Sequence, residues 1–203
     1  MPEDWMFRFL LQSWIVAYEK AILESDPTPK LTIDKASCQA VEDWTNRLKE
    51  IGKIEEADTI GNCYDTMNES INHHIDNLIK GGMWNPNERP NIDPTQYGEN
   101  VLKVTVRNCA YQKGCSWALN EEAFRENGQY RCQRLGCLIG AIKKYMKDEK
   151  LEPSQKNILD YVMTNVMDSQ AGCQCEGFIF LDKENMRNAI LKDNPTKLHE
   201  QQP

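Results

Sequence analysis

The feature that most constrains the fold is a change of hydrophobic period near residue 100. Up to about residue 80, apolar residues recur every three or four positions, which predicts helices. From 101 to 107, in VLKVTVR, apolar and polar residues alternate, which predicts a half-buried strand. Helices followed by strands are typical of the α+β class. We therefore expect an N-terminal helical layer packed with a small antiparallel sheet and a long helix.

The helical part should contain three helices. The first covers residues 4–24 and ends before Pro27 and Pro29, because proline disrupts a helix interior. The second covers 34–50. The third begins near residue 53 and continues to about residue 80, where two consecutive glycines stop it.

The second half of the chain should alternate between helix and strand. Residues 81–100 contain three prolines and predict a loop. Helical spacing returns over 130–147. Residues 161–181 predict a strand, a glycine-containing turn and a second strand, although a helix over 155–167 also fits. A short polar helix is expected at 182–192.

The length of 203 residues suits one compact domain. We expect a helical region at 1–82, a connecting loop at 83–100, a cysteine-rich ligand-binding region at 101–192 and a flexible tail at 193–203.

The charge of the chain argues against nucleic acid as a partner. There are 24 basic and 31 acidic residues, which give a net charge of −7, and the basic residues form no dense cluster. The apolar stretch 5–18 is interrupted by Arg8 and Gln12 and is shorter than the roughly 20 residues of a membrane span. It also lacks the features of a signal peptide. These features predict a cytoplasmic protein.

Six of the eight cysteines lie in the second half of the chain. In a reducing compartment, such thiols bind metal, take part in catalysis or are buried, and seldom form structural disulfides. We expect four of the six to hold one metal site. The candidates are Cys109, Cys115, Cys132, Cys137, Cys173 and Cys175.

Spacing limits which cysteines can act together. Cys132 and Cys137 are five positions apart, about 140° around a helix, so they can share a site only if Cys132 precedes the helix. Cys173 and Cys175 lie about 6.6 Å apart on a flat strand, which suits a bent turn around zinc or a wider iron–sulfur cluster. An iron–sulfur cluster is favoured over zinc because thiols far outnumber histidines. Inert buried thiols and redox chemistry remain alternatives, and Cys38 and Cys63 are expected to be small buried apolar residues on helices.

A resemblance to a known family rests on four segments: VTVRNC (104–109), Cys132, GCLIG (136–140) and CQCEGFIF (173–180). Together they resemble the 4-vinyl-reductase-like ligand-binding domain, which is related in fold to transport-particle subunits of Golgi traffic and to heme-based nitric-oxide sensors. The family spaces its last two cysteines by several residues, whereas here one residue separates them. The chain therefore resembles a variant branch of this family.

The resemblance implies a pocket for a hydrophobic small molecule or tetrapyrrole beside the cysteines. We expect this pocket between the strand and the long helix, with Val104 and Val106 on one side, and with Gly136 and Gly140 letting a ligand or a neighbouring backbone approach. It also implies dimerisation through helices and a setting near pigment metabolism or photosystem assembly, at the periphery of a photosynthetic membrane, where a membrane protein is a further partner.

Two function classes follow. The first is a non-catalytic binding or assembly protein that forms a homodimer or binds a partner through its N-terminal helices. The alternative is a redox enzyme or electron-transfer protein whose cysteine-held cluster acts on a tetrapyrrole-type substrate. No catalytic triad, phosphate-binding loop or dinucleotide motif is present, which favours binding over catalysis.

Histidine and tryptophan offer further candidates. His74 lies on the apolar stripe of the third helix, where a core or interface role is favoured over heme or metal ligation. Tryptophans could stack on a pigment, but a role in the core or a dimer interface is favoured. The four considered for these roles, of five in the chain, are Trp5, Trp14, Trp44 and Trp84.

Overall fold

The computed structural model describes residues 4–93, 101–107, 115, 132–151, 160–169 and 172–180. These residues form a mixed helical and antiparallel structure, which confirms the α+β class. The predicted helix at 182–192 and the tail lie outside the described residues.

The sheet has four strands in the order β1-β2-β4-β3. Their bounds are β1 Asn91–Asp93, β2 Val101–Arg107, β3 Asp160–Ser169 and β4 Gly172–Phe180. All neighbours are antiparallel, and β3 and β4 form the predicted hairpin. The helix alternative for 155–167 is therefore wrong over the part that belongs to β3.

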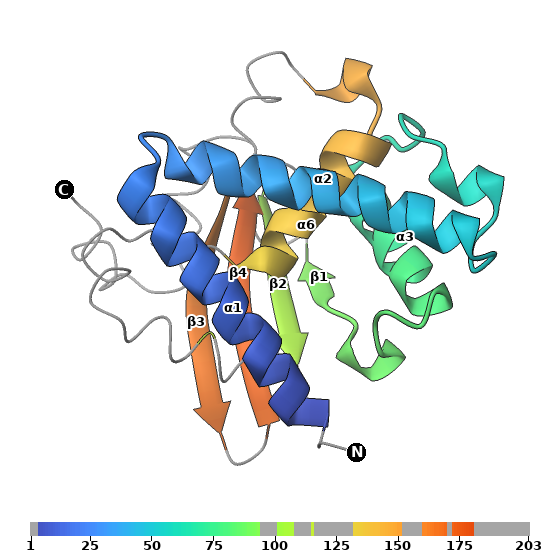
Figure 1. Ribbon diagram of the computed structural model, residues 1–203. Helices are drawn as coiled ribbons and strands as arrows, with labels where there is room; N and C mark the ends of the chain where they lie inside the picture. The colour runs from blue at the N-terminus through green and yellow to red at the C-terminus, as the bar shows by residue number, and fades with distance from the viewer. Residues whose placement is uncertain are drawn as a thin grey trace.

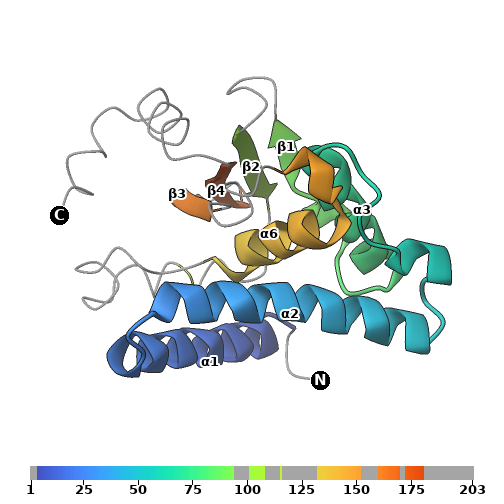
Figure 2. The same ribbon diagram turned by 90° about the horizontal axis from the view of Figure 1, so that it is seen from above.

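The helices cover one face of this sheet (Figure 1). Helix α6 (Gln133–Tyr145) lies between the sheet and α2 (Pro29–Glu50), and α1 (Asp4–Ser25) lies with α2 in the outer helical layer, as Figure 2 shows from above. Because α6 has neighbours on both sides, every residue from Leu135 to Ile142 is buried.

The main core lies between α6, α3 (Met67–Lys80) and the sheet. Strand β2 directs alternate side chains into it, as the two-residue period predicts. Antiparallel pairing places Val106 opposite Cys175 and Leu102 opposite Ile179, so β4 directs the same face inward. Members of this core include Leu102, Val104, Val106, Leu138, Ile142, Ile71, Ile75, Cys175 and Ile179.

The helix predicted from residue 53 is wrong in its first part. Residues 53–66 contain turns and a short 3-10 helix, η1 (Glu56–Thr59). Asn62 adopts a positive φ of 60°, which an α-helix does not accommodate. Helix α3 begins after Thr66, whose side chain accepts a hydrogen bond from the backbone of Glu69 while the Glu69 carboxylate accepts one from the Thr66 backbone.

The start of α2 also differs from the prediction. The helix begins at Pro29, five residues before the expected start. Proline at the first helical position is favourable because its missing N–H has no helical acceptor there.

Gly140 allows α6 and α2 to approach closely. A Cβ at this position would lie 2.9 Å from Val41 Cγ2 and 3.0 Å from the Cα of Cys38. These distances are too short for a Cβ atom, so a larger residue at position 140 would force α6 and α2 to move apart.

We expect Gly140→Ala to lower the free energy of unfolding by about 1–3 kcal/mol, because the added methyl group separates α2 from α6. Urea unfolding followed by circular dichroism measures the effect. Lys143→Ala, at an exposed position of the same helix, is the control and should change stability by less than about 0.5 kcal/mol. Equal stability of Gly140→Ala and the parent would contradict the close packing.

Among the described residues, no helix combines the length and apolar composition that crossing a membrane requires.

Candidate functional site

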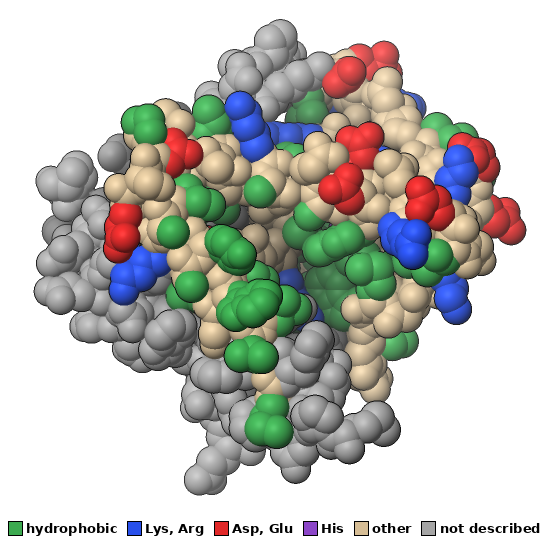
Figure 3. Space-filling view, in the orientation of Figure 1, with side chains coloured by type: hydrophobic (Ala, Val, Ile, Leu, Met, Phe, Trp, Pro, Cys, Tyr) green, Lys and Arg blue, Asp and Glu red, His purple; other side chains and the backbone are tan. Residues whose placement is uncertain are grey.

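Helix α1 is oriented contrary to the usual amphipathic pattern. Its inward side buries two polar residues, Gln12 and Glu19, each 2% exposed. Its outward side exposes large apolar residues, among them Trp14 at 63% and Tyr18 at 68%. Figure 3 shows these hydrophobic side chains gathered along α1.

The two sides follow from the helical period. At about 100° per residue, the inward residues Gln12, Val16 and Glu19 share one direction. The outward residues centre about 180° away. We call them the outer stripe of α1: Met6, Leu10, Trp14 and Tyr18.

The inward polar side chains contact the region of two candidate cysteines. Gln12 Nε2 donates to Cys115 Sγ at 3.5 Å, and both residues are buried. Glu19 accepts a hydrogen bond from the side chain of Gln133, the first residue of α6. Cys132 immediately precedes Gln133. We call Gln12 and Glu19 the polar seam of α1. This seam contacts the Cys115 thiol and the residue that follows Cys132.

Cys132 lies outside the helix, as the spacing argument requires if it is to act with other cysteines. It is the N-cap residue of α6, with extended φ and ψ of −68° and 112°, and its side chain makes no capping hydrogen bond. It is half-buried and packs against the main core.

Cys175 lies on β4 with its side chain in the main core, on the side of the sheet that α6 covers. Its partner Val106 is the last but one residue of β2. Cys109 itself and the side chain of Cys173 lie outside the described residues.

Cys137 faces a different part of the molecule. It packs with Val41, Ala141 and Tyr145 in a small cluster between α6 and α2. Burial, with a smaller contribution from the nearby thiols of Cys132 and Cys38, raises the pKa of Cys137 to about 12. The thiol therefore keeps its proton at neutral pH.

The structure places the two remaining cysteines differently from each other. Cys38 on α2 is half-buried, and burial raises the pKa of its thiol. Cys63 is exposed in the turn before α3 and donates to the carbonyl oxygens of Ile60 and Gly61. The prediction of a buried, helical residue is wrong for Cys63 because the third helix starts later than expected.

Within the described ranges, no three His, Cys, Asp or Glu side chains are grouped closely enough to hold a metal ion. The four-cysteine site thus stays a prediction, since two of its candidate side chains lie outside those ranges.

The residues of the predicted ligand pocket lie where core side chains pack. Val104 and Val106 contact the same cluster as Leu138 and Ile142 of α6. Gly136 is buried, and the backbone of α2 packs closely against Gly140. A ligand pocket between β2 and α6 stays a prediction.

A histidine network between α2, α3 and α6 was missed from the sequence. Tyr64 Oη lies 2.9 Å from His73 Nδ1, and His73 Nε2 lies 2.8 Å from the carbonyl oxygen of Asp58. The His73 ring also packs edge-on against Tyr145, 4.7 Å between ring centroids. Thr45 Oγ1 on α2 lies 3.0 Å from Tyr145 Oη. The network ties the three helices together.

His74 is a core residue, as the sequence favours. It is 1% exposed, and its ring lies parallel to that of Trp44, with the centroids 6.4 Å apart. Within the described residues, neither ring nitrogen has a hydrogen-bond partner. Burial, together with the nearby charges of His73 and Lys144, lowers the pKa of His74 to about 4, so the ring is neutral at pH 7.

The tryptophans divide between core and surface. Trp84 is buried, with the Arg134 guanidinium 4.5 Å from its ring centroid, and Trp44 stacks on His74. Of these three tryptophans, Trp14, Trp44 and Trp84, only Trp14 is strongly exposed.

No protein-family model matches the chain, and neither the curated proteins nor the solved structures include a significant match to it.

Proposed function

We propose that this protein is a non-catalytic binding and assembly module of the 4-vinyl-reductase-like type, which dimerises through α1 and holds a metal site behind that helix. The observation that carries the proposal is the orientation of α1. Its outer stripe faces solvent and its polar seam faces the region of Cys115 and Cys132. One helix thus connects an interface to a cysteine site.

The outer stripe is suited to a second copy of the chain. Large exposed apolar surfaces are rare in monomers and mark interaction sites. Residues 9–18 contain no charged side chain, so two copies can meet there without like-charge repulsion despite the net charge of −7. The helix is about 33 Å long, long enough for the whole stripe to be covered by an equivalent helix.

The cysteine site is proposed to use four of five thiols: Cys109, Cys115, Cys132, Cys173 and Cys175. Cys137 is the weakest candidate because it faces α2 and keeps its proton. The amide of Gln12 donating to Cys115 Sγ supports the proposal, since N–H donors to sulfur stabilise thiolates and tune clusters. An iron–sulfur cluster is the first candidate and zinc the second.

The resemblance adds a hydrophobic ligand, a tetrapyrrole or a related pigment, as the molecule that the module would bind or deliver. It also suggests a cytoplasmic setting at the surface of a photosynthetic membrane. The metal site can be tested without knowing that ligand.

Cys132→Ser tests the metal site without disturbing the fold. Serine is a better N-cap than cysteine, so the variant should keep α6 intact. In protein prepared without oxygen, we expect iron or zinc at about one site per parent chain, and a reduction of at least about tenfold in Cys132→Ser. Elemental analysis measures both, and a broad visible absorption identifies a cluster.

The matched control is Cys63→Ser, which changes an exposed thiol in a distant turn and should retain the metal. A parent chain that contains neither iron nor zinc would contradict the proposal. Equal metal content in Cys132→Ser and Cys63→Ser would contradict the role of Cys132.

A further inference from the structure

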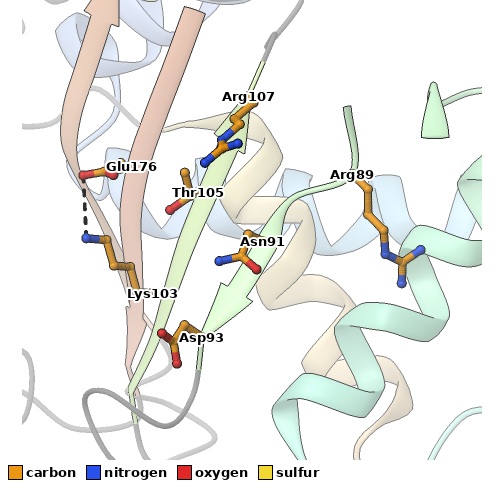
Figure 4. A pocket seen from close by; sticks show the side chains of 7 residues that line it. All are labelled: Arg89, Asn91, Asp93, Lys103, Thr105, Arg107 and Glu176. Atoms are coloured by element: carbon orange, nitrogen blue, oxygen red, sulfur yellow. Dashed lines mark ion pairs between the residues drawn. The ribbon is translucent and has the colours of Figure 1, made fainter. Parts of the chain in front are cut away.

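The face of the sheet opposite α6 carries a polar groove of about 580 Å³. Figure 4 shows its side chains, which come mainly from β1, β2 and β4. This volume is within the range of small-ligand sites, about 300–1,000 Å³. The lining residues are Arg89, Asn91, Asp93, Lys103, Thr105, Arg107 and Glu176.

The strand register fixes how these side chains are arranged. Asn91 of β1 pairs with Thr105 of β2, and Thr105 pairs with Glu176 of β4. The three side chains therefore form one row across the sheet, about 5 Å apart. Arg107 is two residues beyond Thr105 on the same face, about 6.6 Å along the strand.

Two of the three cations in the groove already have carboxylate partners. Lys103 Nζ lies 3.8 Å from Glu176 Oε2. Arg89 donates to Asp76 at 2.5 Å and to Asn72 at 2.7 Å. These cations form the walls of the groove and are partly neutralised.

The centre of the groove is different. Among the described residues, the side chains of Arg107, Thr105 and Asn91 form no hydrogen bond or ion pair, and Arg107 is exposed. A guanidinium presents two parallel N–H donors that match the two oxygens of a carboxylate or phosphate. A hydroxyl and an amide close by supply further donors.

We propose that this groove binds a small organic ligand through an oxyanion group, a carboxylate or a phosphate, held by Arg107 and Thr105. Asn91 binds the next polar group of the same ligand, and the Lys103–Glu176 pair borders it. The site lies on the opposite face of the sheet from the core and from Cys175, so it is independent of the metal site and of the α1 interface.

A nucleic acid does not fit the same groove. Asp93 and Glu176 line it beside the three cations, and the chain as a whole carries a charge of −7. A phosphate backbone would require a run of uncompensated cations. A compact ligand with one oxyanion needs only the guanidinium of Arg107, which has no ion pair within the described part of the chain.

Titration of the labelled full chain with two probes, inorganic phosphate and succinate, tests the site by the backbone amide signals of β1 and β2 in NMR spectra. We expect saturable shifts with at least one probe, and the tighter probe identifies the oxyanion as phosphate or carboxylate. Arg107→Gln should weaken binding at least about tenfold, because it removes the charge and one of the two parallel donors.

Thr105→Val is a second variant that keeps the shape and strand preference of the side chain while removing the hydroxyl. It should weaken binding severalfold with the sheet signals otherwise unchanged. Arg47→Gln, at an exposed arginine of α2 paired with Glu50, is the control and should bind as the parent does. Absence of saturable shifts with both probes would overturn the proposal, as would equal affinities of Arg107→Gln and Arg47→Gln.

Discussion

Replacing Trp14 by glutamate is expected to convert the proposed dimer into a monomer. Trp14 lies at the centre of the outer stripe of α1 and is 63% exposed in the single chain. A tryptophan at the centre of an interface typically contributes 2 kcal/mol or more, about 30-fold in the dissociation constant. A buried, unpaired carboxylate in its place adds a desolvation cost. Multi-angle light scattering across a concentration series measures the change in mass.

Ile60→Glu is the matched control for this substitution. Ile60 is a similarly exposed apolar residue, at 55%, but it lies in the turn after η1 and outside the outer stripe. The control should dimerise as the parent does. If Trp14→Glu retains the mass and dissociation constant of the parent, α1 does not form the interface.

Acidification from pH 7 to 4.5 is expected to lower the free energy of unfolding by about 2 kcal/mol through His74. The ring has a pKa of about 4 in the folded chain and an ordinary value of 6.5. Between pH 6.5 and 4, His74 is protonated in the unfolded chain but stays neutral in the folded chain. Stability from this group is therefore complete above pH 6.5 and is lost progressively as the pH falls towards 4.

His74→Leu separates this effect from other titrations. Leucine cannot be protonated, so the variant should lose about 2 kcal/mol less than the parent between pH 7 and 4.5. Asp26, Asp58 and Asp65 have pKa values lowered below 3.8, chiefly by hydrogen bonds, so the stability they provide is lost only at lower pH. Urea unfolding at pH 7, 5.5 and 4.5 measures the free energy of unfolding of both proteins. The same dependence of this free energy on pH in both would contradict a buried neutral His74.

The parts of the fold that the sequence predicts well are those with an unambiguous period. The alternation in 101–107 predicts β2 and the inward direction of Val104 and Val106, and both are confirmed. Helix α6 is confirmed for the same reason. The β3–β4 hairpin is also confirmed, although residues 155–167 fitted a helix as well. The third helix was predicted too long because its apolar spacing continues through a turn that Asn62 and the cap at Thr66 impose.

The orientation of α1 could not be predicted. A helical period tells which residues share a side, but it does not tell which side faces the rest of the chain. Burial would normally select the side of Trp14 and Tyr18, yet the chain buries Gln12 and Glu19 against α6 and Cys115. Only the tertiary contacts of these two residues reveal this arrangement.

The candidate sites show the same limit. Helical spacing over 130–147 did not tell on which side of the helix start Cys132 lies, and the structure places it just before α6. Spacing also gives no distance between thiols far apart in the chain. The outer groove was missed because its central residues come from two strands whose pairing is not visible in the sequence. The network around His73 was missed because its partners lie on different elements, so they form no recognisable motif in the sequence.

The mass of the intact assembly, measured by native mass spectrometry on protein kept without oxygen, tests both roles of α1 together. The account predicts an assembly of twice the 23.5 kDa chain mass, with each chain carrying additional mass from iron and sulfide or from zinc. A single chain of 23.5 kDa with no added mass at micromolar concentration would contradict it.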